Sequence, residues 1–353
     1  MDRKLYLEPL EEMKKIMIGK YSPLAEYIKV LLLARLMMKI EDIYDPQMDT
    51  HPYPFTAELI NETIDTFKAL MSIERFENKD VLMDDIYGKE KNVIKKHKLL
   101  WQEIWPRHDN KEFQQLIDYR GARLDANNIN KYVKNQKCID FGCGNGNFSF
   151  ALLERGAKSV YGIDFGDNSI RYANKMAKLR RVEKQAKFET KDILNSNLPD
   201  SEFEFALCSA VLHHLSTKKD MAFALKEIAR VLKPESGFFI YVTGSGAISI
   251  DLREACVEIL SDVENQFIEN ILLSLNLTRG KMVHITDSLT ATYLQTEPEE
   301  LMKMLTSAGF SKIRRLKSAA GDPTSWDINV IEKDPYGVEK YGSGELRYFC
   351  VRK

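Results

Sequence analysis

The sequence predicts an α/β protein, in which a doubly wound, mostly parallel seven-stranded sheet follows an all-helical N-terminal domain. Three observations lead to this fold class. Gly142, Gly144 and Gly146 follow a short apolar strand at every second position. Strands and amphipathic helices then alternate to about residue 243, which is typical of parallel sheets. No glycine occurs between Gly19 and Gly88, which favours helices in the N-terminal third.

Two domains are expected, a helical one over 1–125 and a sheet domain over 126–353. In the first, apolar residues recur every three or four positions, as on one face of a helix, at Ile60, Ile64, Phe67 and Met71. A winged-helix domain is disfavoured there because its hairpin needs turn residues. The sheet domain should carry a helical lid, residues 247–293, inserted after its fifth strand. It should also carry a long connection over 318–345.

The first strand and the loop after it are the most informative segment. Ile139 and Phe141 alternate with small or polar residues, and the helix expected over 148–153 should end at Gly156. Glycines without a Cβ allow main-chain N–H groups to face a ligand closely. In the phosphate-binding dinucleotide pattern the third glycine comes three residues after the second. Here it comes after two, so the match to a nicotinamide or flavin site is poor.

The second and third strands should each end near an acidic residue. The strand over 158–165 leads to Asp164, and the strand over 186–193 leads to Asp192 and Ile193. An ionised carboxylate can accept hydrogen bonds from both ribose hydroxyls, so Asp164 is the candidate for that role. The alternative is that Asp164 is a helix N-terminal acid and Asp192 an ordinary loop residue.

The remaining elements follow in the order that such a fold requires. The fourth strand, 203–208, continues into His213 and His214. A capping-box spacing opens a later helix at Thr296. The other expected elements are a helix over 221–232, a breaker over 233–237, a fifth strand over 238–243, one amphipathic helix over 250–275, and strands over 311–316 and 346–351.

Taken together, these motifs resemble the class I S-adenosylmethionine (SAM) dependent methyltransferases, in particular the methyltransferase type 11/12 and ubiquinone-biosynthesis-like branch. The resemblance covers about residues 110–353. It implies SAM as cofactor. It also implies that Asp192 accepts a hydrogen bond from the adenine amino group and that Ile193 packs against the adenine ring. The residues it implies at the cofactor are Asp140, Gly142, Cys143, Gly144, Asp164, Phe165, Asp192, Ile193 and Ser209.

Six histidines are available as a base for methyl transfer, since a neutral imidazole accepts protons near neutral pH. We expect His213 or His284 to face the acceptor, with Asp287 or Tyr293 orienting it. The alternative is that one histidine of the adjacent pair packs over the adenine or caps the next helix.

The acceptor pocket is expected between the N-terminal domain and the segments 247–293 and 318–345, because long connections in a compact domain are often functional. Tyr119 and Arg120 are candidates for the methionyl end of the cofactor, or are surface residues. The substrate candidates are Trp101, Tyr119, Arg120, Asp287, Tyr293 and Trp326.

Composition narrows the classes of function. With 51 Lys and Arg against 52 Asp and Glu, the chain is nearly neutral and has no overall positive electrostatic field that would attract nucleic acid. A basic run over 175–187 is interpreted as a solvated helix face, with an RNA-binding patch as the alternative. Five cysteines lack metal-ligand spacing, so no metal is expected. The same cysteines predict a reducing, cytoplasmic compartment. Charges interrupt the apolar segment 24–40, which predicts no membrane span.

The expected function is SAM-dependent O- or N-methylation of a small-molecule, peptide or natural-product-like acceptor, without nucleic acid or membrane partners. The alternatives are a tRNA- or RNA-modifying enzyme and a non-catalytic methyltransferase-like binding protein. A homodimer is compatible with the sequence.

Overall fold

A computed structural model describes residues 1–45, 48, 50–73, 110–317 and 328–353, and they form two compact units. The helical unit contains the described residues up to 73 together with Gly246–Thr292 and Asp334–Gly342. The sheet unit contains the other described residues. This grouping differs from the expected domains 1–125 and 126–353, because the segment expected as a lid packs with the N-terminal helices and residues 110–126 pack with the sheet.

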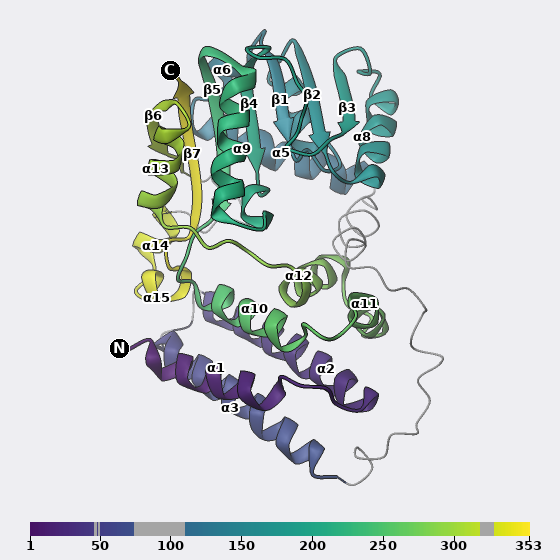
Figure 1. Ribbon diagram of the computed structural model, residues 1–353, viewed down its shortest axis with the longest axis vertical. Coiled ribbons are helices and arrows are strands. Elements are labelled where there is room, and N and C mark those ends of the chain that lie inside the picture. The colour runs from purple at the N-terminus through teal and green to yellow at the C-terminus, as the bar shows by residue number, and fades with distance from the viewer. Residues whose placement is uncertain (46–47, 49, 74–109, 318–327) are drawn as a thin grey trace. The chain divides into compact units, whose positions relative to one another are not determined.

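The sheet unit confirms the predicted fold class. Seven strands lie in the order β3-β2-β1-β4-β5-β7-β6, and only β7 runs antiparallel to its neighbours (Figure 1). Strand β1 is therefore an interior strand, and its carboxyl end lies between those of β2 and β4. The strands are β1 Lys137–Phe141, β2 Ser159–Asp164, β3 Ala186–Thr190, β4 Phe203–Ser209, β5 Leu232–Thr243, β6 Phe310–Arg315 and β7 Glu345–Arg352.

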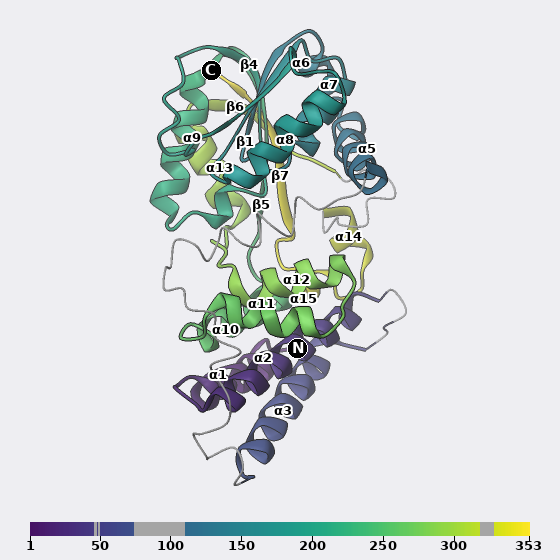
Figure 2. The same cartoon turned by 90° about the vertical axis from the view of Figure 1, so that its right-hand side faces the viewer.

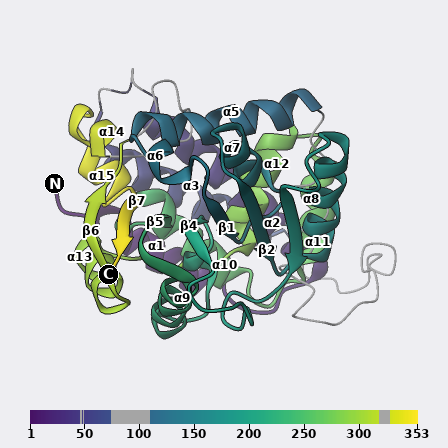
Figure 3. The same cartoon turned by 90° about the horizontal axis from the view of Figure 1, so that it is seen from above.

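Helices cover both faces of this sheet, as Figure 2 and Figure 3 show. One face packs against α5 Asn110–Ala126, α6 Asn130–Val133, α7 Asn147–Glu154 and α8 Asp167–Leu179. The other packs against α9 Lys218–Val231 and α13 Pro298–Ser307. A separate buried apolar cluster fills each interface. The unit also contains the single-turn η4 Leu212–His214 and the short helix α14 Ile328–Lys333.

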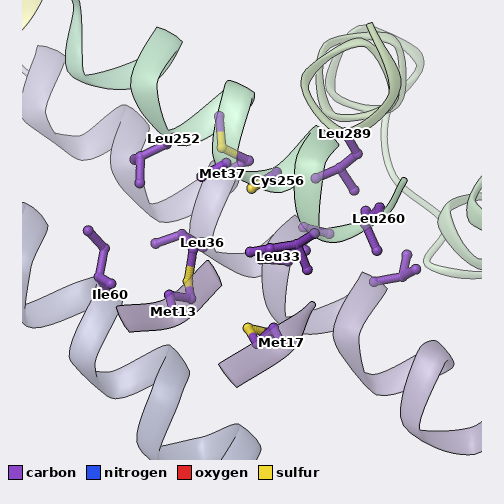
Figure 4. Close-up of a cluster of buried hydrophobic side chains, with 14 of the residues drawn as sticks. Met13, Met17, Leu33, Leu36, Met37, Ile60, Leu252, Cys256, Leu260 and Leu289 are labelled. Carbon is purple, nitrogen blue, oxygen red and sulfur yellow. The ribbon is translucent and has the colours of Figure 1, made fainter. Parts of the chain in front are cut away.

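The helical unit has a core of its own, in which α2 Pro23–Lys39 packs against the helices around it. Leu33 and Leu36 of α2 meet Met13, Ile60 and Leu252 from three other helices (Figure 4). The other elements of this unit are α1 Lys4–Met17, η1 Ile40–Tyr44, α3 Pro52–Met71, α10 Ile248–Ile259, α11 Asn265–Ser274, α12 Arg279–Thr290 and α15 Gly337–Tyr341.

A buried lysine explains why α2 can be charged and yet lie in a core. Lys29 is 1% exposed, and its ammonium lies 2.8 Å from the Glu26 carboxylate. It also donates to the main-chain oxygens of Met17 and Gly19, at 3.1 and 3.3 Å. Met17 is the last residue of α1 and Gly19 lies just beyond it, so the ammonium lies at the carboxyl end of this helix, where a cation is favourable. None of the helices in the described part of the chain is long and apolar enough to cross a bilayer.

Two predicted elements were wrong in detail. The expected helix 250–275 is two helices, because a turn closes between them where Val263 N–H donates to Leu260 O at 2.9 Å. Both apolar side chains are buried, while Ser261 and Asp262 between them favour turns over helices.

The expected breaker 233–237 lies within strand β5. It forms a bulge between the pairs Phe203↔Leu232 and Phe205↔Gly237, with Glu235 at a φ of 61°. Proline has no N–H to donate to the ladder, and it is tolerated at a bulge because the extra residue there is left unpaired. Strand β3 ends at Thr190, so Asp192 lies in the turn after it.

Replacing Leu33 by Ala should lower the free energy of unfolding of the helical unit by about 2–5 kcal/mol, since the side chain is fully buried. Leu24→Ala on the same helix is the control. This side chain is 40% exposed, and its loss should cost within about 0.5 kcal/mol. Denaturant unfolding followed by circular dichroism measures both. Equal losses would show that α2 does not form the core in this way.

Candidate cofactor and acceptor site

The glycine loop turns directly from β1 into α7. The N–H groups of Gly142 and Cys143 both donate to Ile163 O of β2, at 2.8 and 3.0 Å. Gly142, Gly144 and Gly146 have φ values of 69°, 52° and 85°. This left-handed backbone is disfavoured for other L-residues, so the alternate glycines create a turn that most sequences cannot form.

Two of these glycines have different surroundings. A Cβ on Gly142 would lie 2.2 Å from Cγ2 of Val211, a residue just beyond β4. A Cβ on Gly144 would meet nothing within 4 Å. The loop is thus packed tightly against the exit of β4 at its start, and open at Gly144.

Asp164 ends β2 and holds this open part of the loop. Its Oδ2 accepts the Gly144 N–H at 2.9 Å, and its Oδ1 accepts the Gly166 N–H at 2.8 Å. Burial raises the pKa of Asp164, and both main-chain donors oppose that shift. A carboxylate oxygen has two lone pairs, so each oxygen can accept a further hydrogen bond.

Asp140, in contrast, lies beneath the loop. It is 1% exposed, and Ser149 of α7 donates to its Oδ2 at 2.6 Å. Burial raises the pKa of Asp140 to about 7, opposed by the Ser149 hydrogen bond and by Arg120, while the charge of Asp164 adds to the rise. Asp140 therefore joins β1 to the first turn of α7.

The other predicted cofactor residues are distributed around these strand ends. Cys143 is buried, and burial raises the pKa of its thiol, so the thiol is neutral. Phe165, directly after Asp164, is 52% exposed. Asp192 is exposed and accepts the Leu194 N–H at 2.8 Å, whereas the neighbouring Ile193 is partly buried in the sheet core. Ser209 is partly buried at the last position of β4.

His213 lies just beyond β4, in η4, and is held by two distant segments. Its Nδ1 lies 3.0 Å from the main-chain nitrogen of Thr243, at the end of β5. Its carbonyl accepts the Leu294 N–H at 2.7 Å. Its ring centroid lies 4.7 Å from that of Tyr293 and 5.9 Å from that of Tyr241. Tyr293 thus lies beside His213, and a role in orienting the ring toward an acceptor stays a prediction.

The other candidate histidine, His284, belongs to the helical unit. Its Nε2 lies 3.0 Å from the Glu41 carboxylate, and burial lowers its pKa while that carboxylate opposes the shift. Asp287 forms a largely buried ion pair with Arg253, at 2.6 Å. This pair gives Asp287 a stabilising role within the unit, and a role toward an acceptor stays a prediction.

Helix α5 carries two further candidates. Tyr119 is 42% exposed, and the Arg120 guanidinium lies 5.7 Å from the centre of the Phe148 ring, at the start of α7. Arg120 thus lies beside the glycine-loop helix, and its role at the cofactor stays a prediction. Trp101 and Trp326 lie outside the described residues, and the acceptor pocket expected around 247–293 and 318–345 stays a prediction.

A polar cluster at the ends of β5 and β7 was missed by the sequence analysis. Tyr241 and Arg347 are paired in register, with the guanidinium 5.3 Å from the ring centre. Glu345 lies 2.5 Å from the same guanidinium. Burial and the Glu345 carboxylate raise the pKa of Tyr241, whereas the charges of Arg347 and Arg123 lower it. Arg347 and Arg123 are 1% and 3% exposed. The sequence signal that could have revealed this cluster is the presence of polar residues within an otherwise apolar C-terminal strand.

The segment from β1 to β5 carries the sequence signature of a known family. Residues 139–240 match a family model described as a methyltransferase domain. This match identifies a methyltransferase domain within the chain. The match begins in β1 and ends within β5, so it contains the glycine loop and the ends of the first four strands.

Several curated proteins are similar to this methyltransferase domain. A ubiquinone biosynthesis O-methyltransferase of Neisseria meningitidis serogroup C is 27% identical over 161 residues, covering 45% of this chain and 64% of the relative. One from Idiomarina loihiensis is 30% identical over 160 residues, covering 43% and 62%. The chain thus spans less than two thirds of the length of these relatives.

Solved structures are similar at lower identity. A protein from Pyrococcus horikoshii OT3 is 18% identical, with a TM-score of 0.44 and coverage of 75% of this chain and all of the other. The magnesium protoporphyrin IX methyltransferase of Synechocystis PCC 6803, solved with bound SAH, is 16% identical, with a TM-score of 0.41 and coverage of 76% and 91%.

The two glycines with different surroundings should respond differently to substitution. Gly142→Ala should lower the free energy of unfolding of the sheet unit by about 2–4 kcal/mol, from left-handed strain and overlap with Val211. Gly144→Ala should lower it by only about 1–2 kcal/mol, from strain alone. Chemical denaturation measures both. Adding Val211→Ala should recover part of the Gly142→Ala loss, and an absence of recovery would contradict the close packing.

The raised pKa of Asp140 predicts a pH-dependent stability. Between pH 4 and 7 the unfolded chain has released the Asp140 proton while the folded chain retains it, so raising the pH favours unfolding. Relative to Asp140→Asn, the wild type should lose up to about 1.4 kcal/mol of unfolding free energy per pH unit in this window. The difference should level off above pH 7. A difference independent of pH would show that Asp140 is ionised throughout.

Proposed function

We propose that this protein transfers a methyl group from SAM to a small-molecule, peptide or natural-product-like acceptor, through oxygen or nitrogen. One observation carries the proposal. Within the matched methyltransferase domain, the open main chain at Gly144 is hydrogen-bonded to the Asp164 carboxylate, so the ends of β1 and β2 offer a glycine cradle and an acidic group side by side.

The residues at these strand ends fit SAM. Asp164 is oriented by two main-chain donors and can still accept from the two ribose hydroxyls. Gly144 leaves open the space that any side chain would fill. Phe165 and Ile193 would provide apolar surface for the adenine, and Asp192 an acceptor for its amino group. When bound, SAM supplies an electrophilic methyl group on a positively charged sulfur.

The protein's contribution to such a reaction is chiefly to hold donor and acceptor in line, which can supply much of the rate. The end of β4 suits this role, because Val211 is packed against the glycine loop and the His213 ring is fixed by Thr243. Tyr293 lies against the same ring. We infer that these side chains line the acceptor side of the cofactor.

Two cations of the basic run have partners within the sheet unit. The Arg180 guanidinium lies 5.4 Å from the centre of the Phe150 ring and 3.3 Å from the Glu154 carboxylate. Lys187 pairs with Glu189 at 2.6 Å. Arg180 is thus engaged within the sheet unit, while Lys187 forms a surface ion pair.

Titration calorimetry with SAM tests the proposal. The wild type should bind SAM, and Asp164→Asn should weaken binding about tenfold to a hundredfold, because a hydrogen bond to a charged group is lost. The exposed Asp167→Asn in the first turn of α8 is the control and should leave the affinity unchanged. Absence of binding by the folded wild type, or equal affinities in the two variants, would contradict the proposed site.

A further inference from the structure

A groove between α1 and α3 of the helical unit has an apolar end. The groove has a volume of about 620 Å³, and Leu5, Pro54 and Ala57 line it from the first two turns of these helices. The rings of Tyr6 and Tyr53, with centroids 5.1 Å apart, hold the two helix starts together. Leu5 is 44% exposed, so this end offers accessible apolar surface.

The rest of the groove has an acidic wall. Glu58, Glu62 and Asp65 line it at positions i, i+4 and i+7 of α3, and they form one exposed stripe about 10 Å long. Glu62 pairs with Arg35 at 2.8 Å. Among the described residues, Glu58 and Asp65 have no ion-pair or hydrogen-bond partner. The groove therefore carries negative charge that no neighbouring cation compensates.

Helix α8 of the sheet unit carries a basic stripe with the same spacing. Arg171, Lys175 and Lys178 are exposed at positions i, i+4 and i+7. Neither lysine has a partner in the described part of the chain, and Arg171 donates to the neutral Asn168. Leu179 lies one turn after Lys175 and is 62% exposed. Along one face, α8 thus presents three cations followed by an apolar side chain.

We propose that α8 of one copy of this chain docks in the α1–α3 groove of a second copy. With the two helices antiparallel, each cation lies opposite an acid, in the pairs Lys178–Glu58, Lys175–Glu62 and Arg171–Asp65. Leu179 then reaches the apolar end of the groove, whereas a parallel arrangement would place it at the acidic end. Helices that bind in grooves commonly use anchors at this spacing.

A second copy is favoured over nucleic acid because the groove matches both parts of α8. A phosphate backbone would match the cations and leave the Leu179 side chain without an apolar partner. Exposed ion pairs are individually weak and are screened by salt, so this association is weak and depends on ionic strength. It requires no cofactor, and its test is therefore independent of the proposed function.

Sedimentation equilibrium of the wild-type full chain is the first test. In about 20 mM NaCl, the weight-average mass should rise above that of one chain as the protein concentration is raised to about 100 µM. In about 200 mM NaCl the apparent dissociation constant should be about tenfold higher, because salt screens the paired charges. A mass that stays at one chain at every concentration would overturn the proposal.

Two double variants each remove one side of the contact. Glu58→Gln with Asp65→Asn neutralises the groove, and Lys175→Gln with Lys178→Gln neutralises the helix. Each variant alone should associate at least about tenfold more weakly than the wild type, since every contact then lacks one charged partner. An equimolar mixture should form a dimer, because the intact helix of the first variant fits the intact groove of the second.

Matched controls make the same changes in charge elsewhere on the surface. Glu254→Gln with Asp262→Asn, and Lys219→Gln with Lys226→Gln, alter exposed residues outside both stripes and should associate as the wild type does. Equal weakening in the controls would overturn the proposal, because net charge alone would then explain the effect.

Two further outcomes would also overturn it. One is a mixture of the two double variants that stays monomeric while the wild type associates. The other is a wild type that stays monomeric but binds a labelled RNA hairpin, with binding lost in the variant of Lys175 and Lys178. Circular dichroism establishes that the variants are folded. The groove and the helix are tested separately, so either variant decides the matter if the other does not fold.

Discussion

The hydrogen bond from the Gly144 N–H to the Asp164 carboxylate is the interaction on which this site depends. It joins the open part of the glycine loop to the end of the neighbouring strand, over a distance of 2.9 Å. Gly142 fixes the start of the same loop against Val211. A side chain at Gly142 would overlap Val211, and loss of the Asp164 carboxylate would leave the Gly144 amide without its acceptor. The loop conformation and the acid therefore act as one unit.

Local sequence pattern was enough to predict the centre of the sheet unit. The alternate glycines and the acid at the end of β2 lie within about 25 residues of one another, so they can be recognised from a short stretch of sequence. The glycine positions also need a backbone conformation that few residue types can adopt. The seven strands and the helical N-terminal region could also be predicted locally, from hydrophobic periodicity and turn residues. The predicted residues at the glycine loop lie together at the ends of β1 and β2.

What could not be predicted depends on contacts between distant segments. The break between α10 and α11 is set by Leu260 and Val263, whose burial is a tertiary property. The orientation of the His213 ring depends on Thr243, 30 residues away, and that of Tyr241 on Glu345 and Arg347 in the last strand. Sequence pattern identified His213 as a functional candidate, but only the structure shows which segments hold its ring.

A crystal structure of the protein with S-adenosylhomocysteine would test the central claim most directly. The account predicts that the ribose hydroxyls donate to the Asp164 carboxylate while the Gly144 N–H···Asp164 hydrogen bond is retained, with the adenosine lying over Gly144. It would be contradicted by a ligand bound away from the ends of β1 and β2, or by a loop that breaks the Gly144–Asp164 hydrogen bond to admit it.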